Sequence, residues 1–326
     1  MKIAVLYQAA PPPPVHGIQK PMKEGGYRDS GADIAYCLVQ NGTEIILPTD
    51  SPSIGKDLDW VFPDTESGIQ NAIKKGADTF WLNTVLYDSH PILKFSCQGY
   101  SLIGQDPRLA QNYDDKALLN SLLQKQGFPI ISHRLIRSEQ EYSGKFPCIL
   151  KPVRGRGSQG VTLVHDRQGL GDAITSAVQS QKYGSVMMAE PFLSGREVTI
   201  SVFPDGRCLP PVERVQHQNG IMPYNGSVPV SENSRAVLLD KKLHLLCESC
   251  SQIVVWLHLK ALCRIDARMD QQGNYQIFDV NLKPNMTGAS RPHRMDQDSL
   301  TMIAAKAMGW DFYDLLTQFM QFRWKF

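Results

Sequence analysis

The stretch Leu262-Cys263-Arg264-Ile265-Asp266-Ala267-Arg268 alternates apolar and polar side chains, and a second run, Tyr275-Gln276-Ile277-Phe278-Asp279-Val280-Asn281, follows it. Between the two runs, Gln271-Gln272-Gly273-Asn274 supplies a turn, so we expect a β-hairpin. Side chains two apart on a strand share a face, which places Arg264 with Asp266 and Asp279 with Asn281. The hairpin therefore predicts that two carboxylates and an amide oxygen converge.

Such a group of hard oxygen ligands suits Mg²⁺, which binds few protein groups and completes its shell with water and nucleotide phosphates. The alternative interpretation is a solvated polar face, because alternating hairpins with charges on the outer face are common. The hairpin alone does not decide between a metal site and a solvated surface.

A second informative segment lies upstream and reads as a strand, a glycine-rich loop and another strand. It runs Lys151-Pro152-Val153-Arg154-Gly155-Arg156-Gly157-Ser158-Gln159-Gly160. Glycines let backbone amides turn toward an anion, and Lys151 adds a positive charge at the end of the first strand. No Gly-Lys-Ser/Thr triplet closes the loop, so it is not of the Walker type. A glycine-rich turn without a ligand is the alternative.

The order of these segments resembles the ATP-grasp superfamily and, within it, the D-alanine–D-alanine ligase branch. The resemblance covers about residues 100–300 and rests on an ordered series of motifs. It implies a mixed α/β (α+β) ATP-grasp fold of three subdomains, with the nucleotide held between two of them. The motifs are Asp115-Lys116, Lys151-Pro152, Gly157-Ser158-Gln159-Gly160, Glu190-Pro191-Phe192-Leu193 with Glu197, Arg264-Ile265-Asp266, Asp279-Val280-Asn281 and Asn285-Met286-Thr287-Gly288-Ala289-Ser290.

The resemblance also implies the cofactors, which are ATP and one or two Mg²⁺ ions. The residues implied for the phosphates are Lys116, Lys151, Gly157, Ser158 and Gly160. Those implied for adenine and ribose are Glu190, Phe192, Leu193 and Glu197, and those for the metal are Asp266, Asp279 and Asn281.

Catalysis and substrate binding are assigned in the same way. The implied catalytic residues are Arg264, Lys116, Lys151 and Ser158, and the arginine would stabilise the oxyanion of a tetrahedral intermediate. The expected substrate residues are Tyr224, Lys283, Asn285, Ser290, Arg291 and Arg294. Ser290 matches the family's contact to the carboxylate of the incoming amino acid, and the lysine and arginines offer cations to a carboxylate.

Departures from the family pattern concern the first substrate. No acidic residue follows the first strand, which continues as Tyr7-Gln8-Ala9-Ala10-Pro11, and Gly157 falls where the family has a lid serine. The metal-site glutamate is Asp279, and the loop at 221–226 keeps Tyr224 without the family's lysine. A free amine on the donor would then find no counter-charge, which disfavours D-alanine dimerisation.

We therefore predict an ATP-dependent ligase that joins an amino-acid amine to a phosphate-activated carboxylate or vinylogous acid, releasing ADP and phosphate. Natural-product biosynthesis is the expected setting, and ligases that condense an amino acid onto mycosporine-glycine are one candidate group. The alternatives are a D-alanine–D-alanine ligase of cell-wall synthesis, a non-catalytic nucleotide-binding relative, and a phosphotransferase that stops at the phosphorylated intermediate.

Composition favours a cytoplasmic enzyme with small-molecule acid and amino-acid substrates. The formal charge of +2 gives no polybasic signature for nucleic acid, and no apolar run approaches the ~20 residues of a membrane span. Seven scattered cysteines suggest reduced thiols. Cys247 and Cys250 have redox spacing, but they lie in a helical pattern that favours packed thiols. The resemblance leaves a homodimer open.

Periodicity suggests three domains: an N-terminal α/β substrate domain at 1–105, a central nucleotide-lid domain at 106–190 and a C-terminal domain with the metal site at 191–326. In the first we expect parallel strands at 2–6, 44–47 and 79–82 and helices at 29–40 and 68–75. A leucine-rich helix should end at Gly127, and a single helix is expected at 298–323. The prolines at 11–14 read as a stiff loop bordering the cleft.

Overall fold

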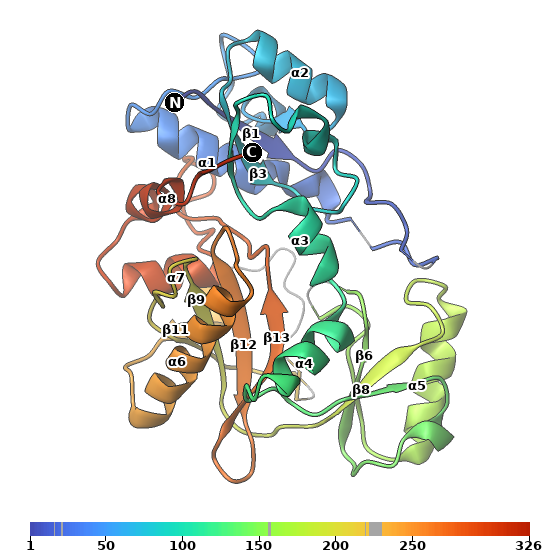
Figure 1. Ribbon diagram of the computed structural model, residues 1–326. Coiled ribbons are helices and arrows are strands. Elements are labelled where there is room, and N and C mark those ends of the chain that lie inside the picture. The colour runs from blue at the N-terminus through green and yellow to red at the C-terminus, as the bar shows by residue number, and fades with distance from the viewer. Residues whose placement is uncertain (16, 21, 156–157, 219, 222–229) are drawn as a thin grey trace.

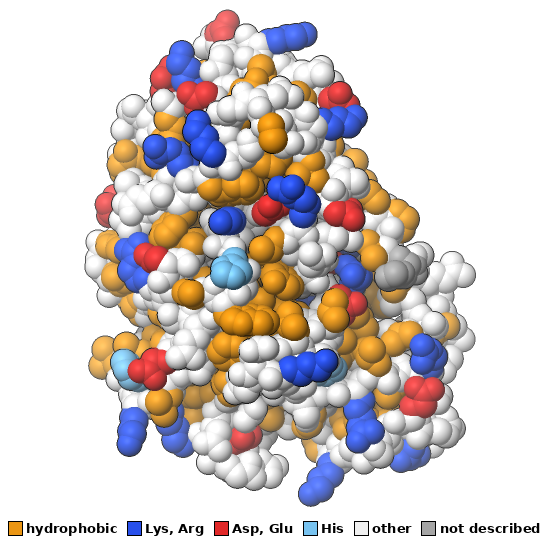
Figure 2. Space-filling model, in the orientation of Figure 1, with side chains coloured by type: hydrophobic (Ala, Val, Ile, Leu, Met, Phe, Trp, Pro, Cys, Tyr) orange, Lys and Arg blue, Asp and Glu red, His pale blue; other side chains and the backbone are white. Residues whose placement is uncertain are grey.

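A computed structural model describes residues 1–326 except 16, 21, 156–157, 219 and 222–229. Three β-sheets with flanking helices make up the molecule, and Figure 1 places one sheet above the other two. The expected α/β class is confirmed. No helix in the described part of the chain is long and apolar enough to cross a membrane. On the face in Figure 2, basic and acidic side chains are interspersed.

The upper sheet has the order β14-β4-β3-β1-β2, and its first four strands in the chain run parallel. The parallel arrangement expected for this part of the chain is thus confirmed. The strand expected at 44–47 is wrong, because an isolated bridge between Ile45 and Ile3 takes its place. The strands are β1 Ile3–Tyr7, β2 Phe62–Pro63, β3 Thr79–Asn83, β4 Ser101–Ile103 and β14 Trp324–Lys325.

Helices α1 Arg28–Gln40 and α2 Glu66–Lys74 belong to this upper part, close to their expected bounds. Below it, α3 Pro107–Asn112 and α4 Lys116–Lys125 lead into the lower half (Figure 1). Asp115 caps α4 by accepting a hydrogen bond from the backbone of Leu118, and this fixes Lys116 as the first helical residue. As expected, Gly127 follows the helix, with the positive φ of 82° that favours glycine.

The second sheet has the order β11-β10-β9-β12-β13 and contains the predicted hairpin. Its strands are β9 Glu197–Val202, β10 Val212–Arg214, β11 Ser234–Ala236, β12 Cys263–Met269 and β13 Tyr275–Asn281. Helix α6 Lys241–Trp256 packs its apolar stripe against this sheet, with Cys250 buried and Cys247 half-buried as free thiols. The interpretation of this cysteine pair as packed helix residues is confirmed.

The third sheet has the order β5-β8-β6-β7, and α5 Arg167–Gln179 covers it. Its strands are β5 Arg134–Ile136, β6 Cys148–Pro152, β7 Thr162–Val164 and β8 Met187–Pro191. β6 and β7 pair antiparallel on either side of the glycine-rich loop, as the sequence predicts. The domain boundaries at 105/106 and 190/191 stay a prediction.

The prediction of a single helix at 298–323 is wrong. The segment forms α7 Leu300–Lys306 and α8 Phe312–Met320, separated by a turn in which Gly309 has a φ of 80°. Asp311 begins α8 with a capping box, and the last residues return to the upper sheet as β14. Short 3-10 helices lie at Glu24–Tyr27, Asp57–Asp59, Pro91–Phe95, Glu139–Glu141 and Val230–Asn233.

The upper sheet and the C-terminal helices share one apolar core, which includes residues of α1, β1, α7 and α8. A buried ion pair crosses the same boundary. Arg291 has no exposed side-chain area, and its guanidinium lies 2.9 Å from an oxygen of Asp33 on α1 and 2.7 Å from one of Asp57. Arg294 adds a second contact to Asp33 at 2.8 Å. These contacts fix the loop after the hairpin of β12 and β13 against the upper sheet.

Arg291→Leu should lower the free energy of unfolding by about 3 kcal/mol, since it leaves the buried Asp33 with Arg294 alone and removes the closest cation from Asp57. The matched control is Arg323→Leu at an exposed position, which should change stability by less than about 0.5 kcal/mol. Denaturant unfolding of both variants measures the difference. Equal losses in the two variants would contradict the role given to the buried pair.

Candidate active site

The centre of the site is a pair of carboxylates on the hairpin. Asp266 lies directly opposite Asp279, and Arg264 lies opposite Asn281. Opposed residues have Cβ atoms about 4.5–5.5 Å apart, so their oxygens are able to converge. The register shifts after Asp266 and leaves Phe278 as an extra residue on β13. This bulge turns Asp279 onto the face of Asp266, whereas strict alternation from the buried Ile277 would turn it away.

Asp266 is held from two neighbouring positions. Arg264 donates from Nε and Nη2 to the two carboxylate oxygens, each at 3.0 Å, and Thr199 on β9 donates its hydroxyl to Oδ1. Burial lowers the pKa of Arg264, but the adjacent Asp266 outweighs it, so the net direction is upward. The arginine therefore stays charged in the cleft.

Asp279 is held by Lys116, whose ammonium pairs with it from the start of α4. Burial alone would raise the pKa of Asp279, yet Lys116 and then Lys151 hold it below its usual value. Burial would likewise lower the pKa of Lys116, but Asp279 raises it. Both groups are consequently ionised at neutral pH.

Lys151 reaches the same cleft from β6. Its ammonium lies 2.8 Å from Glu190 and donates to the carbonyl of Phe278 at 3.0 Å. Glu190 is only 2% exposed, and burial raises its pKa although Lys151 opposes the shift. Its Oε1 has no hydrogen-bond partner in the described structure. A buried acceptor without a donor is a position that a ligand amine can fill.

The donor set fits Mg²⁺. Within the described residues, no group of three or more His, Cys, Asp or Glu side chains is placed to hold a metal. The site instead offers two carboxylates and the amide oxygen of Asn281 on one face of the hairpin. Mg²⁺ characteristically takes one or two protein carboxylates and leaves its other positions to water and phosphate.

Residues expected at adenine and ribose follow the end of β8. Phe192 and Leu193 are half-buried, and the ring of Phe192 packs under Arg268 at 5.0 Å from the guanidinium carbon. Glu197, at the start of β9, lies 2.9 Å from Nε2 of His217 and 3.7 Å from Arg268. A ribose hydroxyl would therefore meet a carboxylate that is already oriented by two neighbours.

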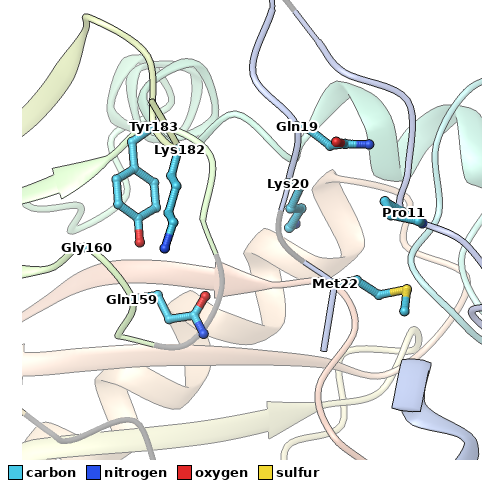
Figure 3. Close-up of a pocket in the computed structure, with 8 residues that line it drawn as sticks. All are labelled: Pro11, Gln19, Lys20, Met22, Gln159, Gly160, Lys182 and Tyr183. Atoms are coloured by element: carbon cyan, nitrogen blue, oxygen red, sulfur yellow. The ribbon is translucent and has the colours of Figure 1, made fainter. Parts of the chain in front are cut away.

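The glycine-rich loop connects β6 and β7 of the third sheet. Gly157 is outside the described residues, whereas Gly160 has a φ of 74° and sits so close to Pro152 and Tyr183 that an added Cβ would be 2.8 Å from each. A cavity of about 590 Å³ opens beside it (Figure 3). Its lining is Pro11, Gln19, Lys20 and Met22 on one side and Gln159, Gly160, Lys182 and Tyr183 on the other.

Of the expected substrate residues, Lys283 lies at the end of β3 in the upper sheet. Lys283 donates to Oδ1 of Asn83 at 3.3 Å and stands 3.4 Å over the ring of Tyr27. Asn285 contacts Thr287, and the hydroxyl of Ser290 is buried with no hydrogen-bond partner among the described residues. Tyr224 lies outside the described residues.

The two arginines expected to receive a substrate carboxylate need a different account. Arg291 is fully buried among Asp33, Asp57 and backbone carbonyls, and Arg294 pairs with Asp33 and Asp29. Because protein carboxylates already occupy both guanidinium groups, this geometry does not support substrate binding by either one. The two arginines instead form the buried ion pairs that join this loop to the upper part of the molecule.

Sequence reasoning missed several residues that complete the site. Thr199 donates a hydrogen bond to Asp266, and His217 is hydrogen-bonded to Glu197. Lys283 contacts Asn83 by a hydrogen bond and the ring of Tyr27 by a cation–π interaction. A signal for Thr199 was present, because the alternating run 197–202 puts it on the face of Glu197. The other partners come from distant segments and leave no such periodic signal.

Comparison with known proteins agrees with this geometry. The family profile described as D-ala D-ala ligase C-terminus matches residues 121–321. The D-alanine–D-alanine ligase of Acinetobacter baumannii is 30% identical over 224 residues, which are 64% of this chain and 66% of the relative. That of Aquifex aeolicus is 31% identical over 174 residues, 53% of this chain and 55% of the relative. The chain thus matches just under two thirds of the length of such relatives.

Solved structures extend the likeness to nearly the whole chain. The D-alanine–D-alanine ligase of Bacillus anthracis complexed with ATP has a TM-score of 0.66 at 18% identity and covers 98% of this chain and 96% of that one. The VanG D-Ala:D-Ser ligase of Enterococcus faecalis has a TM-score of 0.66 at 16% identity, covering 98% of both chains. The fold is therefore that of ATP-grasp proteins. With the profile match, the chain belongs to the D-alanine–D-alanine ligase family.

Asp279→Asn should lower turnover at least ~100-fold, because it removes one charge from the carboxylate pair and takes away the anionic partner of Lys116. A bound metal stabilises a transition state by several kcal/mol, and each ~1.36 kcal/mol corresponds to a tenfold change in rate. The control Asp205→Asn changes an acid that is about half exposed in the same half of the molecule and should leave turnover unchanged. Circular dichroism checks that both variants fold. Full activity of Asp279→Asn would remove the metal-site assignment.

Proposed function

We propose that this protein is an ATP-dependent ligase that joins an amine to a phosphate-activated carboxylate or vinylogous acid. The observation that carries the proposal is the opposed pair Asp266 and Asp279, flanked by Arg264 and Lys116. Membership of the D-alanine–D-alanine ligase family and a similar fold solved with ATP support it. An acid is a poor electrophile until its oxygen becomes part of a leaving group, and a phosphoryl group makes it one.

ATP and Mg²⁺ are the proposed cofactors. Asp266, Asp279 and Asn281 would hold the metal, and Mg²⁺ bound there would neutralise charge on the β- and γ-phosphates. Lys116 and Lys151 would lie against the same phosphates, because both ammonium groups face this end of the cleft. Glu190 would accept from the adenine amine, for which its unpartnered Oε1 is available.

The proposed reaction has two steps. First, an oxygen of the donor acid attacks the γ-phosphorus, the bond to the bridging oxygen of ADP breaks, and an acyl phosphate forms. Then the amine of the acceptor attacks the activated carbon, the bond to the phosphate oxygen breaks, and the amine proton passes to solvent. Arg264 would stabilise the oxyanion that forms between attack and departure, a role of preorganised donors in acyl transfer.

The donor is the open part of the proposal. The similar proteins are D-alanine–D-alanine ligases, which favours D-alanine at this position, and D-alanine dimerisation is the second candidate function. The residues favour a donor without a free amine. Asp29 and Asp64 are engaged by protein partners near the upper sheet, and Lys283 places a positive charge beside Asn83 that would attract a carboxylate. An amine buried there without a counter-charge would be desolvated at a cost.

Stoichiometry tests the reaction type. Purified protein with Mg-ATP, candidate acids and a panel of amino acids should release ADP and phosphate in equal amounts, one of each per bond formed. AMP with pyrophosphate would contradict phosphoryl activation. ADP with a phosphorylated acid and no coupled product would identify a phosphotransferase, and a protein that binds nucleotide without turnover would be a non-catalytic relative.

Substrate choice is a separate prediction. We expect little D-alanyl-D-alanine and more product from a donor that lacks a free amine, such as mycosporine-glycine, because the described acids near Lys283 are already paired. Mass spectrometry of products at equal donor concentrations makes the comparison. D-alanine dimerisation as fast as the best amine-free donor would support the second candidate and overturn this account of the pocket.

A further inference from the structure

Arg214 is the last residue of β10 and lies directly opposite Glu197 on β9. Opposed residues share a face, and the same rule places Thr199 opposite Asp266 and Asp266 opposite Asp279. Arg214 therefore projects from the same face of the sheet as the carboxylate pair. Sequence reasoning did not assign it a role.

What distinguishes Arg214 is its lack of an anionic partner. Its Nε is buried without a hydrogen bond, and no ion pair to its guanidinium occurs in the described part of the chain. The other two arginines on this face are engaged: Arg264 by Asp266, and Arg268 by Glu197 together with the carbonyls of Gly195 and Gly220. Burial and then the nearby Arg264 lower the pKa of Arg214, and the more weakly acting Asp266 and Glu197 do not offset this shift.

Nearby acids do not account for this cation. Glu213 precedes it but projects from the opposite face, where Arg196 and Arg235 bind it. Glu197 is taken by His217 and Arg268. A half-buried guanidinium next to a second arginine is unfavourable unless an anion is supplied from outside the chain. Because Arg214 shares a face with Asp266 and Asp279, the proposed metal ligands, a phosphate of the nucleotide is the anion that fits.

We propose that Arg214 is a phosphate-binding residue that donates to the γ-phosphoryl group of bound ATP, an inference that rests on the proposed function. Lys116 and Lys151 both have carboxylate partners, so Arg214 supplies a cation whose donors are still available. A guanidinium suits the task because its fork of N–H groups matches phosphate oxygens. As the phosphoryl group passes from ADP to the donor oxygen, Arg214 stabilises the negative charge on its oxygens.

Nucleotide binding tests this contact without knowledge of the donor. With Mg²⁺ present, calorimetry measures the Kd of the β,γ-imido analogue of ATP and of ADP for wild type, Arg214→Met and Arg214→Lys. Arg214→Met keeps the apolar stem and removes the donors, and it should weaken the analogue at least tenfold while changing the Kd of ADP less than twofold. Arg214→Lys should lie between, because it keeps the charge and loses the fork.

The matched control is Arg235→Met on the adjacent strand β11, whose side chain is 70% exposed and which should change neither Kd. Equal weakening of both nucleotides by Arg214→Met, or no weakening of either, would overturn the assignment to the γ-phosphate. If Arg214→Met does not fold, as judged by thermal unfolding, the comparison of ATP analogue with ADP in Arg214→Lys decides in the same way. Failure of the wild type to bind either nucleotide would instead contradict the proposed function.

Discussion

The register of β12 against β13 is the constraint on which the rest of the site depends. It places Asp266 opposite Asp279, so two like charges meet in a partly buried cleft. Such a pair is unfavourable unless cations or a metal compensate it. Arg264 and Lys116 provide that compensation from the hairpin itself and from α4. A site of high charge density results, in which Mg²⁺ and phosphate would replace the internal ion pairs under the proposed function.

Segments far apart in the chain meet around this hairpin. The start of α4, the end of β6 and the end of β8 contribute Lys116, Lys151 and Glu190, and each of these is buried or half-buried. The loop beyond β13 is in turn fixed to the upper sheet by the buried contacts of Arg291 with Asp33 and Asp57. We expect this ion pair to hold the loop beyond the proposed metal site in place beside the proposed donor pocket.

Local patterns in the sequence predicted the elements that hold the site. Alternation and the turn at 271–274 predicted the hairpin, and the glycine loop between two strands was likewise evident. The bulge at Phe278 was not predicted, although Ile277 and Val280 on the buried face break the two-residue period and could have revealed it.

Charges with distant partners were harder to interpret. Arg291 and Arg294 were interpreted as substrate-binding cations. Their acidic partners lie more than 230 residues earlier in the chain, so the local sequence does not reveal the ion pairs. A single C-terminal helix was expected at 298–323, yet Gly309 and the cap at Asp311 divide it. The break comes from the positive φ of the glycine and from the capping preference of the aspartate.

A crystal structure with Mg²⁺ and ADP is the most direct test of the central claim, that the opposed carboxylates of the hairpin hold a metal against nucleotide phosphate. The account predicts Mg²⁺ at about 2.0–2.1 Å from oxygens of both Asp266 and Asp279, with phosphate oxygens in its remaining positions. A bound nucleotide whose metal contacts neither carboxylate, with Lys116 and Arg264 still paired to them as they are now, would contradict it.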